Sequence, residues 1–159
     1  MKEATHIREL TAADREPVLD MYRSFDLLGV AQGLPPRTEE ARDDWVDHIL
    51  AEDHSLGAWS EEGRLMGHVF LAFSDFGVAE LAAFVHQDFR QRRLGTTLTQ
   101  KLVEWAGTHQ IRRVWALVAS DNLPALRLLK RCGFRTAQLT FPTIEMELDV
   151  APSQAAAHL

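Results

Sequence analysis

An arginine-rich turn with one glycine is the part of this sequence whose residue types most clearly predict chemistry. It covers residues 90–96, between an apolar run typical of a buried strand, residues 78–85, and a segment with helical spacing, residues 96–109. The first turn of a helix leaves backbone N–H groups unpaired and carries the positive end of the helix dipole. Arginines donate charge-assisted hydrogen bonds, and Gly95 lets the backbone approach a ligand closely. We therefore predict a pyrophosphate site here, with an ordinary surface turn as the alternative.

Glu80 stands within the apolar run 78–85, where a carboxylate is costly unless it is solvated or functional. It is the best candidate for a general base in this sequence. The alternative is an exposed position near the end of a strand. His86, directly after the run, is a weaker candidate for proton transfer, because a histidine at a strand end is more often a surface residue.

The net charge of −6 hides an uneven distribution along the chain. Residues 86–135 hold ten lysines and arginines against three acids, whereas the rest of the chain holds seven bases and twenty acids. The basic segment predicts a local site for an anion, although solvated helix faces would give the same pattern. The acidic remainder would repel a long nucleic acid, so no nucleic-acid partner is expected.

Alternating strand-like and helix-like segments place these residues in an α/β domain with a mixed sheet. Strands are expected at residues 6–10, 55–60, 65–73, 78–85, 114–119, 135–141 and 143–148. Helices are expected at residues 11–28, after Thr38 with Ala41, Trp45 and Ile49 on one face, at residues 96–109, and after Asp121 or Asn122. The run 78–85 is so apolar that we expect it to be buried on both faces.

A chain of 159 residues has the size of one domain, and we expect a single domain over residues 1–150 and a disordered tail over residues 151–159. No apolar run approaches the ~20 residues that span a bilayer, so no membrane partner is expected. The N-terminus lacks the features of a signal or transit peptide, which makes the cytoplasm the expected compartment. The lone Cys132 and the spacing of His48 and His54 predict neither a disulfide nor a metal site.

Two motifs in register resemble those of the GNAT superfamily of acyl-CoA N-acyltransferases. The segment from Arg90 to Gly95 resembles the family's Q/R-x-x-G-x-G/A signature, with Arg93 where the first glycine is usual. Downstream, the segment from Asn122 to Phe134 is similar to the family's N-x-x-A…GF helix. The resemblance covers roughly residues 5–148 and implies a mixed α/β (α+β) fold. Its mostly antiparallel sheet would have about six or seven strands, flanked by about four helices and splayed between two central parallel strands.

The resemblance implies acetyl-CoA as cosubstrate, bound between the strand that ends at Val85 and the strand that ends at Ala119. The pantetheine arm would pair with backbone near Phe84 and Val85, and the pyrophosphate would bind the arginine-rich turn. The implied cofactor-binding residues are Phe84, Val85, Arg90, Gln91, Arg92, Arg93, Leu94, Gly95, Thr96 and Asn122. This ligand would account for the basic segment, although a free nucleotide would satisfy the same charges.

Glu80 gains a role from the same resemblance. Acyl transfer to an amine requires an ammonium of pKa about 10 to lose a proton, so a base or a water relay is expected near the acceptor. The sequence around Glu80 looks like that of Pat-like protein lysine acetyltransferases, in which a glutamate at this place is the catalytic base. Leu129 occupies the place where many members carry a tyrosine that protonates the departing thiolate, but a thiol of pKa about 8.5 is a tolerable leaving group without an acid.

The implied function is acetyl transfer to a primary amine by direct attack on the thioester. The acidic remainder of the chain favours a cationic acceptor, and the context of Glu80 favours a protein lysine over a small-molecule amine. A non-catalytic acyl-CoA sensor is the alternative from another class, because Arg93 and Leu129 both depart from the family pattern. We expect residues 29–37 to act as a lid over the acceptor, and the sequence leaves a homodimer open.

Overall fold

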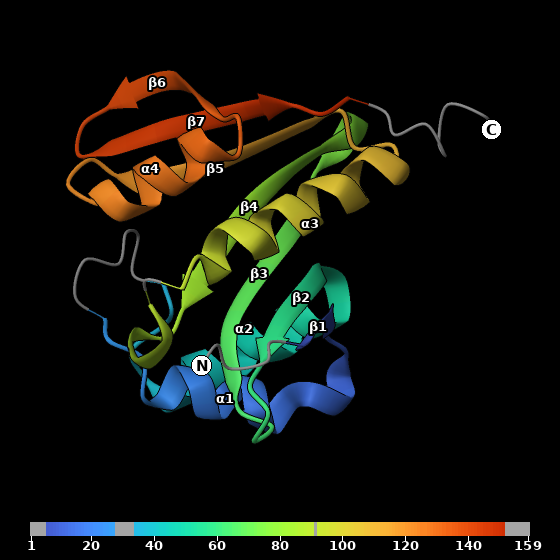
Figure 1. Cartoon of the computed structure of the whole chain (residues 1–159), viewed down its shortest axis with the longest axis vertical. Coiled ribbons are helices and arrows are strands. Elements are labelled where there is room, and N and C mark those ends of the chain that lie inside the picture. Colours follow the sequence, from blue (N-terminus) through green and yellow to red (C-terminus); the bar gives the residue numbers. More distant parts are fainter. Residues whose placement is uncertain (1–5, 28–33, 91, 152–159) are drawn as a thin grey trace.

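The computed structural model describes residues 6–27, 34–90 and 92–151 (Figure 1). Within these ranges one sheet has seven strands in the order β1-β2-β3-β4-β5-β7-β6. The strands are β1 His6–Glu9, β2 His54–Trp59, β3 Leu65–Phe73, β4 Val78–Val85, β5 Arg113–Ala119, β6 Arg135–Thr140 and β7 Thr143–Asp149. The α-helices are α1 Arg15–Arg23, α2 Glu39–Glu52, α3 Leu94–Thr108 and α4 Leu123–Arg131, and short 3-10 turns are η1 Ala12–Asp14, η3 Asp75–Gly77 and η4 Gln87–Phe89. None of the helices in the described ranges has the length and apolar character needed to cross a membrane.

The sheet is antiparallel throughout the described ranges except between β4 and β5. These two strands run parallel and pair only near their starts, from Val78 opposite Arg113 to Glu80 opposite Trp115. Beyond Glu80, β5 continues to pair with β7 and β4 with β3, so the two central strands separate toward their ends (Figure 1). The expected mixed sheet, splayed between two parallel strands and flanked by four helices, is confirmed.

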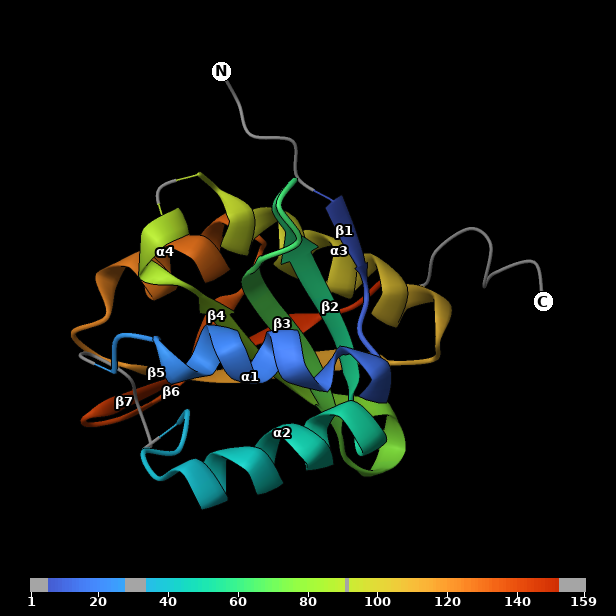
Figure 2. The same cartoon turned by 90° about the horizontal axis from the view of Figure 1, so that it is seen from below.

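The helices cover the two faces of the sheet unequally. Helix α3 packs on β2, β3 and β4 from one side, and α1 and α2 contact β3 from the other (Figures 1 and 2). A first core cluster lies under α3 and includes Leu98, Leu102 and Met146. A second cluster under α1 includes Leu19 and Tyr22. Strand β4 lies between these two layers, so its side chains reach both.

Strand β4 is not buried on both faces, and that expectation is wrong. Ala79 and Leu81 are buried on the side of α3, but Glu80 and Phe84 on the opposite face are only half-buried, and Ala83 is exposed. The physical reason is the separation from β5, which removes a neighbouring strand from the second half of β4. The apolar sequence of β4 therefore belongs to a strand that lies beside the opening between β4 and β5, and not to a strand that is covered on both faces.

Helix α1 is shorter than the sequence predicted. Thr11 and Asp14 form a capping box, and the helix ends at Arg23; Leu28, the expected end, lies outside the described residues. Phe25 is buried but follows the helix. The lid and tail predictions also lie partly outside the described residues, which omit 28–33 and 152–159.

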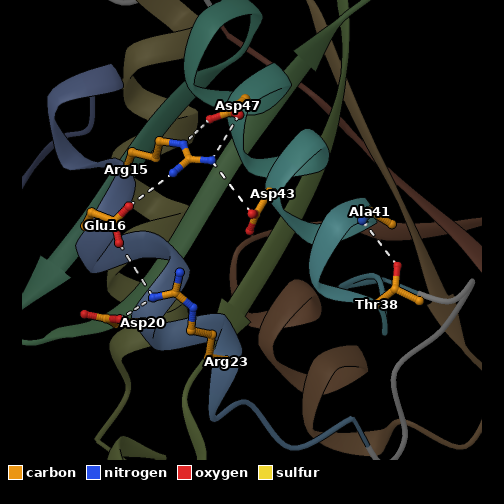
Figure 3. A network of polar contacts seen from close by, with 8 residues as sticks. All are labelled: Arg15, Glu16, Asp20, Arg23, Thr38, Ala41, Asp43 and Asp47. Atoms are coloured by element: carbon orange, nitrogen blue, oxygen red, sulfur yellow. Dashed lines mark hydrogen bonds and ion pairs between the residues drawn. The ribbon is translucent and has the colours of Figure 1, made fainter.

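Thr38 caps α2 as predicted, accepting a hydrogen bond from the Ala41 N–H at 3.2 Å (Figure 3). Two members of the expected apolar face meet the core, because Ile49 is buried and Trp45 packs against the second core cluster, whereas Ala41 is exposed. Val46, which the pattern did not include, is also buried.

An ion-pair network joins α1 to α2 (Figure 3). The Nε of Arg15 lies 2.6 Å from an Asp47 carboxylate oxygen, and a second guanidinium nitrogen lies 3.9 Å from Asp43. Arg23 continues the network along α1 to Glu16 and Asp20. Exposed pairs of this kind contribute about 0–1 kcal/mol each, so the network orients the two helices more than it stabilises the fold.

Gly77, in the turn between β3 and β4, has a φ of +73°, and a Cβ there would lie 2.8 Å from the Gln110 carbonyl oxygen. We expect Gly77→Ala to lower the free energy of unfolding by about 3 kcal/mol, because it adds left-handed strain to a backbone clash. Gly63→Ala is the matched control: its φ is +81° but its surroundings are open, so strain alone costs about 1 kcal/mol. Urea unfolding of both variants measures the difference, and equal losses would contradict the close approach.

Candidate active site

The N-terminus of α3 presents backbone donors to the arginine-rich turn. The first helical hydrogen bond runs from the Thr97 N–H to the Arg93 carbonyl at 3.0 Å, and Arg93 provides no side-chain cap. The N–H groups of Leu94, Gly95 and Thr96 precede that bond and therefore belong to the unpaired first turn. Unpaired N–H groups and the positive end of a helix dipole are the features that favour binding of an anion, and here they lie just beyond the end of β4.

Arg93 takes the backbone conformation of a glycine. Its φ of 58° and ψ of 23° are left-handed, which costs a residue with a side chain about 1 kcal/mol. The turn therefore has a conformation that favours glycine, although an arginine occupies the position. The departure from the family signature adds a cation to the same place.

Arg90 and Arg92 add further cations beside this turn. The Arg90 Nε donates to the Val85 carbonyl at 3.2 Å, and its guanidinium lies 5.9 Å from the centre of the Phe25 ring. The Arg92 guanidinium lies 5.4 Å from the ring centre of the buried Phe89. Both arginines are exposed, so their charges remain accessible to a ligand. Gln91, also predicted to bind the cofactor, lies outside the described residues.

Gly95 and the side chain of Thr96 face α4 rather than the turn. A Cβ at Gly95 would lie 2.5 Å from a Leu128 methyl carbon, so helix α4 approaches the glycine closely. The Thr96 hydroxyl is buried and accepts a hydrogen bond from Arg131 at 3.3 Å. These two residues therefore fix α4 on α3 and leave their backbone N–H groups for a ligand.

The basic segment, residues 86–135, does not form a single site in the folded chain. Arg90, Arg92 and Arg93 gather at the start of α3. Arg113 lies opposite the start of β4, and its guanidinium is 3.5 Å from Asp149 of β7. Arg135 forms ion pairs with two acids of β7, Glu147 and Asp149. The expectation that one anionic ligand accounts for the whole segment is therefore wrong, because strand register pairs part of it with acids.

The remaining predicted cofactor contacts lie along the opening between β4 and β5. Beyond Glu80 the backbone of β4, including Phe84 and Val85, has no β5 partner among the described residues. The Phe84 ring packs against Tyr22 and Trp45, at centroid distances of 5.6 and 5.7 Å, and its backbone pairs with His68 of β3, so the part of β4 left for a ligand is the edge that faces β5.

Asn122 lies at the N-cap of α4, beyond the end of β5. Its side-chain oxygen accepts a hydrogen bond from the Ala125 N–H at 3.2 Å. This cap uses the oxygen, so the amide nitrogen is the group that can donate to a ligand. The predicted cap is confirmed at Asn122 rather than at Asp121.

Glu80 lies at the last position of β4 that pairs with β5, opposite Trp115 of β5 and Ala72 of β3. Burial raises the pKa of its half-buried carboxyl group, and the neighbouring Asp53 carboxylate raises that pKa further. Within the described ranges, no side chain donates a hydrogen bond to the Glu80 carboxylate. Glu80 is therefore a carboxylate poised to accept a proton more readily than an exposed one.

Asp53, at the end of α2, was not identified from the sequence. Burial raises the pKa of its carboxyl group, with a smaller rise from Glu52 and an opposing effect from His48. The residue lies 27 positions before Glu80, and the register of β2, β3 and β4 brings the two together. Nothing in the local sequence of Asp53 indicates a site, so its proximity to Glu80 could not be predicted.

His86 is buried, contrary to the surface position expected for it, with 1% of its surface exposed. The Asp88 N–H donates to its Nδ1 at 3.1 Å, so Nε2 carries the proton and donates to the Ser24 hydroxyl at 2.9 Å. Burial is the main cause of a lowered pKa. Both ring nitrogens are occupied, so this histidine holds two segments together and is not placed to move a substrate proton.

Leu129 and Cys132 of helix α4 both serve packing. Leu129 is buried in the first core cluster, and Cys132 is half-buried with its sulfur 3.9 Å from the Thr96 carbonyl oxygen. Burial raises the pKa of the Cys132 thiol, which disfavours the thiolate. Over the described parts of the chain, no group of three or more histidine, cysteine or acidic residues could hold a metal ion.

Comparison with known proteins identifies the class. The sequence model of the acetyltransferase (GNAT) family matches residues 6–134, so the chain belongs to that family and is an N-acetyltransferase by class. No curated protein matches the sequence.

Solved structures share the fold at low sequence identity. A GNAT-family acetyltransferase from Streptococcus pneumoniae has a TM-score of 0.76 at 17% identity, with 93% of this chain and 100% of that chain covered. A phosphinothricin acetyltransferase from Sinorhizobium meliloti, in complex with acetyl-CoA, has a TM-score of 0.77 at 19% identity, covering 95% and 91%. A spermidine N-acetyltransferase from Vibrio cholerae, in complex with CoA and spermine, has a TM-score of 0.75 at 15% identity, covering 93% and 96%.

Proposed function

We propose that this protein transfers an acetyl group from acetyl-CoA to a cationic primary amine, with Glu80 as the general base. The observation that carries the proposal is the placement of Glu80 and the anion site on one strand. Glu80 lies where β4 and β5 begin to separate, and the arginine-rich turn follows the end of the same strand at Val85. Five strand residues span about 17 Å, a length of the order of an extended pantetheine arm.

In this pose the pyrophosphate would lie on the first-turn N–H groups of α3, beside Arg90, Arg92 and Arg93. The pantetheine amides would pair as an added strand with the edge of β4 near Phe84 and Val85 that has no β5 partner, where the ligand would replace the Arg90 Nε at the Val85 carbonyl. The Asn122 amide nitrogen is available to donate to the same arm. Support for the pose comes from the edge of β4 that lacks a β5 partner beyond Glu80 and from the donors at the end of that strand.

The reaction needs one proton acceptor from the protein. The Glu80 carboxylate would take the ammonium proton, directly or through a water, and free the nitrogen lone pair to attack the thioester carbonyl carbon. The carbon–nitrogen bond forms, the carbon–sulfur bond breaks, and the thiolate leaves. A thiol of pKa about 8.5 leaves without an acid, which is consistent with the buried Leu129.

Acidic side chains support a cationic acceptor. Helix α2 carries six acids and one arginine. The residues around Glu80 favour a protein lysine, and a small amine is the second acceptor class. Thiol release from acetyl-CoA with spermidine, a lysine-containing peptide and folded proteins separates the two classes.

A non-catalytic acyl-CoA sensor is the second candidate function, and the absence of an acid at Leu129 favours it. The two functions differ in one measurement. An enzyme releases free thiol from acetyl-CoA with at least one acceptor of the panel, whereas a sensor is stabilised by CoA but releases none.

Arg93→Gly tests the cofactor site with the fold kept intact. Glycine relieves the left-handed strain, so the unliganded protein should be stabilised by about 1 kcal/mol. Loss of one charge-assisted contact should weaken CoA binding about 10- to 100-fold. Calorimetry and thermal unfolding with CoA measure both effects.

Arg113→Ala is the matched control, because its guanidinium lies at the other end of β4. It should leave CoA affinity unchanged, and Arg90→Ala should weaken it as Arg93→Gly does. Unchanged affinity in Arg93→Gly would contradict the placement of the pyrophosphate. If millimolar CoA failed to raise the melting temperature of the unsubstituted protein, the cofactor site itself would be wrong.

A further inference from the structure

We propose that Gln87 is a positioning residue that couples the cofactor turn, residues 90–96, to the face of β4 that carries Glu80. It would do so by holding residues 24–26, the segment that leaves α1. The proposal rests on the function proposed above. It concerns a link between the two halves of the site rather than a contact with either substrate.

Gln87 uses both ends of its side-chain amide on one short segment. Its nitrogen donates to the Ser24 carbonyl at 2.6 Å, and its oxygen accepts from the Asp26 N–H at 3.0 Å. The neighbouring His86 adds a third bond to the Ser24 hydroxyl. Turn η4 and the end of α1, some sixty residues apart in sequence, are thus joined by three hydrogen bonds.

Phe25 lies between the two residues that Gln87 holds, and it reaches toward both sides of the site. The Arg90 guanidinium lies 5.9 Å from the centre of its ring, so a ligand that moves Arg90 acts on Phe25. On the other side, the Phe25 ring lies 5.8 Å from that of Phe84 and 5.8 Å from that of Tyr22. Phe84 shares a strand face with Glu80 because the two are an even number of residues apart.

The chemistry of the side chain explains why glutamine suits this position. An amide supplies one donor and one acceptor group, which match the Ser24 carbonyl and the Asp26 N–H. A glutamate of the same length keeps the acceptor but loses the donor, and an alanine loses both. The three side chains therefore form a graded series for testing the link.

Amide hydrogen exchange of the full chain, with and without CoA, tests the coupling. In the unsubstituted protein CoA should slow exchange of the Asp26 amide at least 10-fold, together with the amides of residues 94–96. In Gln87→Ala, CoA should still bind with its dissociation constant changed less than 3-fold and protect residues 94–96, but exchange at Asp26 should change less than 2-fold. Gln87→Glu should give an intermediate response at Asp26.

The kinetic signature is a split between the two substrates. With the acceptor that gives the highest thiol release, Gln87→Ala should raise the KM for the amine several-fold and leave the KM for acetyl-CoA unchanged. If CoA protects residues 94–96 but not Asp26 in the unsubstituted protein, the coupling is overturned and the cofactor site stands. If Gln87→Ala loses CoA affinity 10-fold or more, Gln87 belongs to the cofactor site and the proposal is also overturned. If CoA protects neither segment, the proposed function fails instead.

Discussion

Glu80→Gln is expected to lower the rate of acetyl transfer by about 10²- to 10⁴-fold, the usual contribution of a general base. Glutamine keeps the shape of the side chain but cannot accept the ammonium proton. Release of free thiol at saturating acetyl-CoA measures the loss. The affinity for CoA should not change, because the proposed contacts with CoA are made by the backbone of β4, the turn at residues 90–96 and Asn122.

The pH profile gives this prediction a second readout. Activity should fall as pH falls through the pKa of Glu80, since only the carboxylate accepts a proton. Asp53 is one cause of the raised pKa, so Asp53→Asn should move the acidic limb to lower pH while activity at high pH persists. Glu104→Gln, on the exposed side of α3, is the matched control for loss of a carboxylate. Unchanged turnover in Glu80→Gln would rule out the proposed base.

Stability should fall steeply in acid because of His68. Its two ring nitrogens bond to the Tyr22 hydroxyl at 2.7 Å and the Ser55 hydroxyl at 3.0 Å, and burial lowers its pKa from 6.5 to about 3. Above pH 6.5 the ring is neutral in both the folded and the unfolded chain. As pH falls from 6.5 toward 3, only the unfolded chain takes up the proton. His68 by itself should therefore lower the free energy of unfolding by about 1.4 kcal/mol per pH unit across this interval.

Urea unfolding at pH 7, 5.5 and 4 measures that slope. His68→Gln should be less stable at pH 7, since it disturbs the bonds to Tyr22 and Ser55, but its slope should be shallower by about one proton. His6→Gln, at an exposed position of β1, is the control and should keep the slope. A slope that is the same in His68→Gln as in the unsubstituted protein would show that the acid sensitivity arises elsewhere.

Local signals explain what the sequence predicted well. The caps at Thr11, Thr38 and Asn122 are contained within four residues each, and the strand, turn and helix around Gly95 follow one another directly. Periodicity and capping are properties of neighbouring residues, so a single sequence carries them. Glu80 is likewise noticeable from its own apolar run, in which its charge stands out, and its role as a base stays a prediction.

Register explains what the sequence could not predict. Asp53 approaches Glu80 only through the pairing of β2, β3 and β4, and Gln87 meets Ser24 only because η4 lies beside the end of α1. Arg113 belongs to the basic segment in sequence, but β7 places Asp149 3.5 Å from it. Each of these contacts depends on which strand neighbours which, and no local pattern carries that information.

The short parallel pairing between β4 and β5 has a mechanical consequence. Strands β1 to β4 and strands β5, β7 and β6 are two leaves of the sheet, which pair with each other over three residue pairs at one end. A ligand that pairs with the free edge of β4, as proposed, would act as an additional strand and resist the opening of the leaves. Binding of CoA would then also stiffen the sheet. Conditions that weaken the pairing between strands should therefore also lower the affinity for CoA.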